Sequence, residues 1–379
     1  MKDFLTTIQT GAPLLLDGGM GSLMVQLGGS MKSGENNLLH PQVVEQAHRL
    51  YLEAGSKAII TNTFSLNAIY AGKQKWSAAE TERSLRAAME IALKAAGGEH
   101  YVLADLGPSG EMLAPFGTGD SEQYYQAYRL QAQQMAEYAI DAFIIETVID
   151  INEALIILRA CRDSAPQIPV LLSMTFSSFK RGGCTLMGNT AADIAAKAEA
   201  NGASVVGANC GDLTPEQYAQ IVASMRGACS LPLLIQPNAG KPKKEGQQTI
   251  YPLGPDEFAR QMQECYAAGA RLLGGCCAPP LSILQRYPAC WVNKRRLAVK
   301  ALGGKCGLSA TAVKYLACLF MLIDHIGLLL FPQIVVLRDI GRLSFPLFAF
   351  MLANGYRHTS NYWRYLLRLV VFAAGFQWV

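Results

Sequence analysis

Three cysteines could do chemistry because each lies at the end of a short apolar run. Cys210 comes near the end of SVVGANCG, and Cys276 and Cys277 close RLLGGCC. Successive side chains on a regular strand point to opposite faces, so two adjacent cysteines can act together only where the chain leaves the strand. Gly274 and Gly275 allow the backbone conformations that this requires. The pattern predicts three thiols that converge beyond two strand ends.

Three thiolates are a ligand set that suits Zn²⁺, which prefers four tetrahedral ligands and keeps one position open in catalytic sites. Two alternatives exist for the adjacent pair by itself: two small apolar side chains under a loop, or a strained disulfide between neighbours. Cys210 at the same predicted edge favours the metal site. The amino terminus shows no secretory signal, and clustered cysteines in a reducing cytosol are more often metal-binding or catalytic than disulfide-bonded.

Polar residues end most of the other apolar runs. The candidates are Asp17, Asn62, Thr63, Asp105, Glu146, Thr147 and Asn238. Taken alone, Asp17 would be a turn residue and Glu146 an acid stabilised at a helix amino terminus. Their common position at run ends favours a binding role. The stretch GGMG after Asp17 lacks the third glycine of a nucleotide-binding fingerprint.

The elements that would position these residues repeat along residues 1–295. Eight apolar runs alternate with segments of helical character that are rich in Ala, Glu, Gln and Leu. The runs are residues 13–19, 57–64, 101–107, 142–148, 169–176, 204–211, 232–240 and 271–277. Continuously apolar strands are typical of a parallel sheet covered on both faces. Eight such units predict an α/β protein with a (β/α)8 TIM barrel, whose sites lie at the carboxyl ends of the strands. A doubly wound sheet is the competing fold, and the even repeat disfavours it.

Five segments together resemble the homocysteine S-methyltransferase family, above all the homocysteine-binding module of cobalamin-dependent methionine synthase. They are LLLDGGMGSLM, YLEAGSKAIITNTFSLN, IIETVID, GANCGDLTPEQ and LLGGCC, and the resemblance covers about residues 8–290. It implies that Cys210, Cys276 and Cys277 bind zinc. The residues that it implies around the amino acid substrate are Asp17, Gly18, Gly19, Asn62 and Glu146, and Thr63 is grouped with them by position. The chain departs from the family pattern at 278–280, where Ala-Pro-Pro follows the double cysteine.

The implied chemistry agrees with these residue types. Methyl transfer to a thiol near neutral pH needs a thiolate, and zinc deprotonates a thiol that coordinates it. Glu146 could receive the substrate ammonium, and backbone N–H groups at Gly18 and Gly19 could receive its carboxylate. No folate- or cobalamin-binding module is expected after residue 295. The methyl donor is therefore expected to be a methyl-corrinoid on a partner protein or a small donor of the S-methylmethionine type.

The rest of the chain differs in composition from the predicted barrel. The whole chain carries a net charge of +4, but from Lys300 onward eight basic residues face two acids, which leaves −2 for residues 1–299. Residues 311–379 contain apolar runs, the first long enough to span a bilayer, and resemble a truncated part of the TraX family of membrane proteins. We expect a barrel domain at 1–292, a linker at 293–310 and a transmembrane segment at 311–379.

These features favour a zinc-dependent methyltransferase that converts homocysteine to methionine, with a cytoplasmic barrel held at a membrane by its tail. Asp324 and His325 lie inside the first apolar run, where ionisable groups are costly. An inert anchor is nevertheless the favoured interpretation of the tail. The alternatives are a membrane-anchored, TraX-like acyltransferase fragment and a non-catalytic thiol-binding barrel. No basic, aromatic-interleaved patch in residues 1–299 indicates nucleic acid.

Overall fold

The computed structural model describes residues 3–10, 12–179, 182–241, 243–245 and 248–277. The chain divides into two compact units, Met1–Arg295 and Arg296–Val379, and the described residues all belong to the first. The predicted linker at 293–310 and the predicted transmembrane segment at 311–379 lie outside the described residues, so both stay predictions. Within the described part of the chain, no helix has the length and apolar character needed to cross a membrane.

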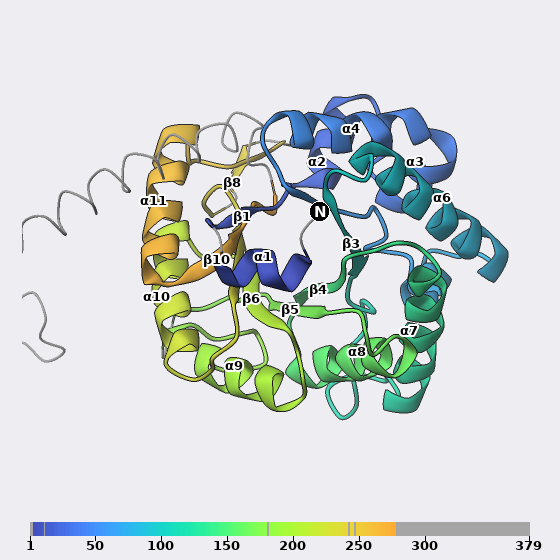
Figure 1. Ribbon diagram of the computed structural model, residues 1–379. Coiled ribbons are helices and arrows are strands. Elements are labelled where there is room, and N and C mark those ends of the chain that lie inside the picture. The colour runs from blue at the N-terminus through green and yellow to red at the C-terminus, as the bar shows by residue number, and fades with distance from the viewer. Residues whose placement is uncertain (1–2, 11, 180–181, 242, 246–247, 278–379) are drawn as a thin grey trace, which may run out of the picture. The chain divides into compact units, whose positions relative to one another are not determined.

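Eight parallel strands form one sheet in the order β1-β10-β7-β6-β5-β4-β3-β2 (Figure 1). Their bounds are β1 (Leu14–Leu15), β2 (Ala58–Ile60), β3 (Tyr101–Leu106), β4 (Ala142–Val148), β5 (Val170–Met174), β6 (Val205–Cys210), β7 (Leu233–Pro237) and β10 (Ala270–Leu273). Seven of them fall within the predicted apolar runs, and β10 begins one residue before the eighth run. The predicted parallel sheet is thus confirmed.

The ring closes between β1 and β2, the first and last strands of that order. The backbone N–H of Lys57 donates to the Leu15 carbonyl at 2.8 Å, and Ser56 Oγ donates to the Leu16 carbonyl at 3.1 Å. Asp17 Oδ2 accepts the Ile60 N–H at 2.8 Å. These bonds form the seam of a closed barrel, so the (β/α)8 prediction is confirmed over the doubly wound alternative.

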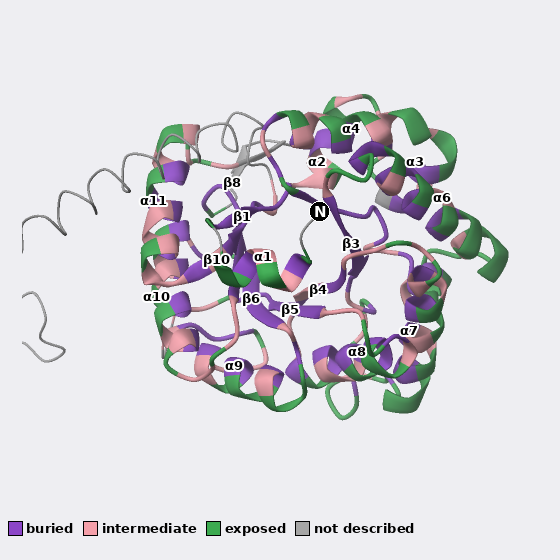
Figure 2. Cartoon of the chain, in the orientation of Figure 1, coloured by how far each residue is buried: buried purple, intermediate pink, exposed green. Residues whose placement is uncertain are grey.

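Helices surround the strands and turn their apolar faces inward (Figure 2). They are α2 (Met20–Gln26), α3 (Ser33–Leu39), α4 (Pro41–Glu53), α5 (Ala68–Lys73), α6 (Ala78–Ala96), α7 (Ser121–Ala136), α8 (Ile151–Ser164), α9 (Ala191–Ala200), α10 (Pro215–Arg226) and α11 (Pro255–Ala268). Side chains set several of their starts: Ser77 and Glu80 form a capping box on α6, and Thr214 with Gln217 forms another on α10. A hairpin of β8 (Lys243–Glu245) and β9 (Gln248–Ile250) lies between β7 and α11 in the chain.

The short amino-terminal helix α1 (Phe4–Thr10) covers one end of the barrel. Phe4 and Ile8 are buried in the same cluster as the inward-facing strand residues. Thr7 Oγ1 shares a hydrogen bond of 2.7 Å with the hydroxyl of Tyr101, the first residue of β3. The covered end is therefore the amino end of the strands, and a functional site is expected at the opposite, carboxyl end.

The inward-facing residues change from apolar to polar toward that carboxyl end. Because side chains two apart on a strand share a face, each polar residue follows a member of the inner apolar cluster. The pairs are Leu103 and Asp105, Ile144 and Glu146, Leu171 and Ser173, and Leu234 and Gln236. The barrel interior is thus apolar toward the amino ends of the strands and polar toward their carboxyl ends. The polar part is the polar upper layer.

Candidate active site

The three predicted cysteines meet at the carboxyl end of the barrel. Cys210 is the last residue of β6, and Cys276 and Cys277 follow β10. Their Sγ atoms all lie within 4.8 Å of one another, and those of Cys276 and Cys277 are 4.0 Å apart. A disulfide needs about 2.05 Å, so the neighbouring pair is not bonded. Four sulfurs at about 2.3 Å from one tetrahedral zinc ion lie about 3.8 Å apart, so the trio fits such an ion.

The backbone after β10 is held by the strand on each side. Gly275 N–H donates to the Asp17 carbonyl of the β1 side at 3.2 Å, and Cys276 N–H donates to the Pro237 carbonyl of β7 at 3.1 Å. The chain has left the pleat here, so Cys276 and Cys277 no longer alternate between two faces. This is how two adjacent thiols reach one point.

Asn238, which follows β7, ties the two cysteine-bearing loops together. Its Oδ1 accepts the Cys277 N–H at 2.9 Å, and its Nδ2 donates to the Gly211 carbonyl at 2.8 Å. The side chain is 3% exposed. Asn238 therefore fixes Cys277 relative to the backbone beside Cys210, in addition to ending a strand as predicted.

Cys210 adopts an uncommon backbone conformation. Its φ is +57° and that of Gly211 is +72°, so two left-handed residues in succession turn the chain sharply. A Cβ at Gly211 would lie 2.2 Å from the Phe176 carbonyl oxygen, which only glycine avoids. The Tyr218 hydroxyl donates to the Cys210 carbonyl. Strained residues of this kind concentrate at functional sites.

The three thiols differ in how readily they ionise. Hydrogen bonds from Cys210 and Cys276 lower the pKa of Cys277 to about 3, and the Tyr251 hydroxyl adds a further one. Hydrogen bonds with Cys210 and Cys277, together with burial, raise the pKa of Cys276 well above its ordinary range. The trio thus stabilises one thiolate by donation from its neighbours.

Three carboxyl groups lie in the polar upper layer beside the thiols. Burial raises the pKa of Glu146 to about 7, and the Cys210 thiol adds to this effect. Burial also raises the pKa of Asp17 and of Asp105 well above the ordinary range, with Glu146 nearby as a further cause. Carboxyl groups that repel one another in a buried layer hold their charge poorly, so the layer favours a cationic ligand.

Several buried atoms of this layer have no hydrogen-bond partner among the described residues. They are Asp17 Oδ1, Asp105 Oδ1, Thr175 Oγ1 and Gln236 Oε1. All four can accept a hydrogen bond. A buried acceptor without a partner costs about 1–3 kcal/mol, so a ligand that brings several N–H donors would satisfy the layer.

The remaining predicted substrate residues have partners within the protein. Asn62 Nδ2 donates to Asn37 Oδ1 on α3 at 2.8 Å. Thr63 Oγ1 donates to the Asp105 carbonyl and is 2.7 Å from Thr61 Oγ1. Both side chains are buried. They connect the end of β2 to its neighbours and thereby hold Asp105 in place.

Gly18 and Gly19 form the turn between β1 and α2. A Cβ on Gly18 would lie 3.0 Å from Cε1 of the buried Tyr51, so the backbone packs closely against that ring. Gly19 is the N-cap residue of α2, and no side chain caps this helix. Backbone N–H groups therefore begin α2 without a side-chain acceptor at the cap.

Thr147 and Asn209 hold Glu146; Thr147 was a candidate by its position at a run end, whereas Asn209 was not predicted. Thr147 has a φ of +61°, and the pairing of β4 with β5 shifts register between Ile145 and Val148. Asn209 holds this irregularity: its Oδ1 accepts the Thr147 N–H at 3.0 Å, and its Nδ2 donates to Thr147 Oγ1 at 2.7 Å. Asn209 directly precedes Cys210 in the chain, but no sequence signal points to a partner 62 positions away.

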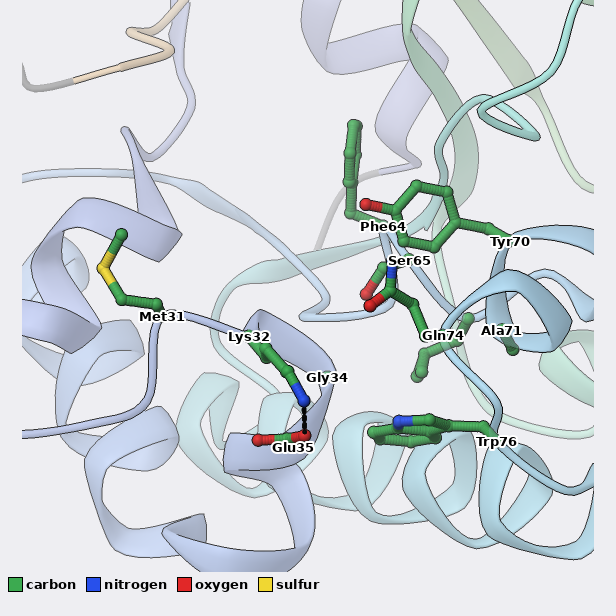
Figure 3. A pocket seen from close by; sticks show the side chains of 11 residues that line it. Met31, Lys32, Gly34, Glu35, Phe64, Ser65, Tyr70, Ala71, Gln74 and Trp76 are labelled. Carbon is green, nitrogen blue, oxygen red and sulfur yellow. Dashed lines mark hydrogen bonds and ion pairs between the residues drawn. The ribbon is translucent and has the colours of Figure 1, made fainter.

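A separate cavity of about 280 Å³ lies between α3, α5 and the loop after β2 (Figure 3). Lys32 and Glu35, joined at 2.9 Å, face the rings of Tyr70 and Trp76 across it. Neither the three cysteines nor the three carboxyl groups line this cavity.

The family of the chain follows from a match that spans most of the barrel. The family model described as homocysteine S-methyltransferase matches residues 14–280. The chain belongs to the homocysteine S-methyltransferase family. A second family model, described as TraX protein, matches residues 309–376, which lie outside the described residues. That segment is similar to the TraX family over this range.

Curated relatives agree with the family. The chain is 30% identical to methionine synthase of Mycobacterium leprae over 251 residues, which cover 64% of this chain and 20% of the relative. It is 29% identical to the Mycobacterium tuberculosis methionine synthase over 272 residues, 69% of this chain and 22% of that protein. The chain thus spans about a fifth of the length of each methionine synthase. Homocysteine S-methyltransferase 2 of Arabidopsis thaliana is 26% identical over 334 residues, 78% of this chain and 98% of the relative.

A solved structure supports the fold. The metallated form of the Escherichia coli homocysteine methyltransferase MmuM superimposes with a TM-score of 0.63 at 20% identity. The match covers 74% of this chain and 97% of that one. The barrel is therefore the fold of a family member over nearly its whole length.

Proposed function

We propose that this chain is a zinc-dependent methyltransferase that binds homocysteine and methylates its sulfur to form methionine. One observation supports this most strongly: three convergent thiols adjoin a buried layer whose unpartnered atoms can all accept a hydrogen bond. Homocysteine carries a thiol at one end and an ammonium group at the other. It therefore matches both halves of the site.

Cys210, Cys276 and Cys277 would hold the zinc ion. When bound, the ion supplies a site at which a substrate thiol is deprotonated near neutral pH. Asn238 and the backbone around Gly275 keep the three side chains in place, so little reorganisation is needed on binding.

The carboxyl groups would orient the other end of the substrate. An ammonium group has three N–H donors, and Asp17 Oδ1, Asp105 Oδ1 and Glu146 offer acceptors of the right charge. A cation between them also lowers their pKa values, which returns the carboxyl groups to the charged form. The backbone N–H groups at Gly18 and Gly19 would receive the substrate carboxylate, with Asn62 and Thr63 supporting the neighbouring strand end.

The methyl donor that we propose is a methyl-corrinoid carried on a partner protein, because two of the relatives are named methionine synthases. A small sulfonium donor of the S-methylmethionine type is the second candidate. It is favoured by the match to nearly the full length of a protein named homocysteine S-methyltransferase.

The full chain loaded with zinc tests the proposal. We expect calorimetry to show homocysteine binding that is lost when zinc is removed, and mass spectrometry to show methionine after addition of methylcobalamin or S-methylmethionine. Zinc-dependent binding without methionine from either donor would favour the non-catalytic thiol-binding barrel. Absence of zinc-dependent binding would contradict the proposal altogether.

A further inference from the structure

The carboxamide of Asn209 connects two strand tips that are not neighbours in the barrel. Asn209 lies on β6 and Thr147 on β4, and β5 lies between these strands. The side chain is fully buried. It makes two hydrogen bonds to Thr147, from Nδ2 to Oγ1 at 2.7 Å and to Oδ1 from the backbone N–H at 3.0 Å. The Asn209 side chain therefore crosses the inward face of β5.

Ser173 on β5 makes this crossing possible. Its Oγ donates to Asn209 Oδ1 at 2.9 Å, and its side chain is also fully buried. A backbone N–H can only donate, so the two donors from Thr147 and Ser173 fix the orientation of the amide. The amide group consequently presents its Nδ2 to Thr147 Oγ1. The three side chains form one connected set.

Thr147 needs such support because of its conformation. Its φ of +61° is a conformation that β-branched residues rarely adopt. It lies within the register shift of β4, and irregularities of this kind redirect adjacent side chains. Glu146 directly precedes it. The direction of the Glu146 carboxylate therefore depends on the conformation that Asn209 holds.

Cys210 is the other neighbour of this set. It directly follows Asn209, has a φ of +57°, and belongs to the cysteine trio. Asn209 is thus next to Cys210 in the chain, and its contact with Thr147 links it to Glu146. Glu146 is the carboxylate that we propose to bind the ammonium group. These two groups would bind the two ends of the substrate.

We propose that Asn209 is a positioning residue that sets the spacing between the thiol-binding end and the ammonium-binding end of the site. It thereby selects homocysteine over cysteine, whose side chain is one methylene shorter. This inference rests on the proposed function, because it needs both ends of the site to bind one substrate. Asn209 itself does not need to touch the substrate.

The test compares zinc-loaded full-length variants by calorimetry with homocysteine and with cysteine. Loss of a hydrogen bond to a charged group lowers affinity by about 10- to 150-fold. We expect Asn209→Ala to keep its zinc but to bind homocysteine about 10- to 100-fold more weakly, with a smaller preference over cysteine. Asn201→Ala, an exposed asparagine after α9, is the matched control. Unchanged affinity and unchanged preference in Asn209→Ala would overturn the inference.

A second substitution separates positioning from general damage. Glycine adopts positive φ without support, so Thr147→Gly combined with Asn209→Ala should regain most of the lost affinity and preference. A double variant no better than the single one would show that Asn209 acts in some other way. If Asn209→Ala does not fold, Thr147→Val removes only the Oγ1 partner of Nδ2. Unchanged homocysteine binding in that variant would also overturn the inference.

Failure of the proposed function gives a different result. If the zinc-loaded wild-type chain binds neither amino acid, the proposed function is wrong and the claim of substrate selection is wrong with it. If the wild type binds homocysteine and all variants match it, only the inference about Asn209 is wrong.

Discussion

Asn238 accepts the backbone N–H of Cys277 and at the same time donates to the carbonyl of Gly211. Asn238, which was not predicted to bind the metal, thus fixes the loop of Cys277 relative to the loop of Cys210. Groups that orient metal ligands commonly affect metal affinity by about 10- to 100-fold.

We therefore expect Asn238→Ala to weaken zinc binding by about 10- to 100-fold while all three thiols remain. Competition against a chromophoric chelator measures the affinity. Asn152→Ala, at an exposed position on α8, is the control. Equal zinc affinity in Asn238→Ala and the control would show that the loops hold their positions without this side chain.

The cysteine trio itself predicts zinc stoichiometry. Wild-type protein should contain about one zinc per chain, and Cys277→Ser should lose most of it after dialysis because one of three sulfur ligands is gone. Cys229→Ser is the matched control, since Cys229 is a half-buried free cysteine outside the trio. Elemental analysis decides the matter, and equal zinc in both variants would rule out the trio as the site.

Glu146→Gln should weaken homocysteine binding and leave zinc in place. Hydrogen bonds to charged groups contribute about 1.5–3 kcal/mol, which corresponds to about 10- to 150-fold in affinity. Calorimetry with 4-mercaptobutanoate, which is homocysteine without its amino group, provides the control. If Glu146→Gln weakens both ligands equally, the carboxylate does not recognise the ammonium group.

Asp105 predicts how stability depends on pH. Burial raises its pKa well above the ordinary value of 3.8, so the folded state binds more protons than the unfolded state in the range above about pH 4. The contribution of this group to stability is therefore complete at low pH and is lost as pH rises through the folded-state pKa.

Asp105→Asn removes this dependence. Relative to wild type, the variant should gain stability as pH rises from 5 to 8, by up to about 1.4 kcal/mol per pH unit. Urea unfolding at several pH values measures the free energy of unfolding. Glu90→Gln, at an exposed position of α6, provides the comparison. Parallel pH profiles for wild type and Asp105→Asn would contradict this account of the buried carboxyl group.

The sequence predicted the barrel and the cysteine trio because both follow from coarse features. Continuously apolar runs specify a parallel sheet whatever the details of each strand, and all carboxyl ends of a closed barrel meet at one edge. Cys210, Cys276 and Cys277 could therefore be brought together from run ends alone. The same argument placed Asp17 and Glu146 on that edge.

The directions of the side chains beyond the strand ends were not predictable in this way. Thr63 ends a run as Glu146 does, yet its hydroxyl is bonded to Thr61 and to the Asp105 carbonyl. The two-residue alternation of a strand stops where the strand stops. From there, partners distant in the chain decide the orientation, as Asn209 does for Thr147.

The seam between β1 and β2 has a consequence for the dynamics of the barrel. In one of its bonds the Asp17 side chain accepts the N–H of Ile60, whereas the other neighbouring strands are joined by backbone ladders, two of which contain a register shift. Local opening requires least free energy where few hydrogen bonds must break. The amide of Ile60 should therefore exchange with deuterated solvent faster than the amides of the central strands. The other oxygen of Asp17 belongs to the proposed ammonium site, so a bound substrate would slow that exchange. The exchange rate of the Ile60 amide would then report whether the substrate site is occupied, although this amide does not touch the substrate.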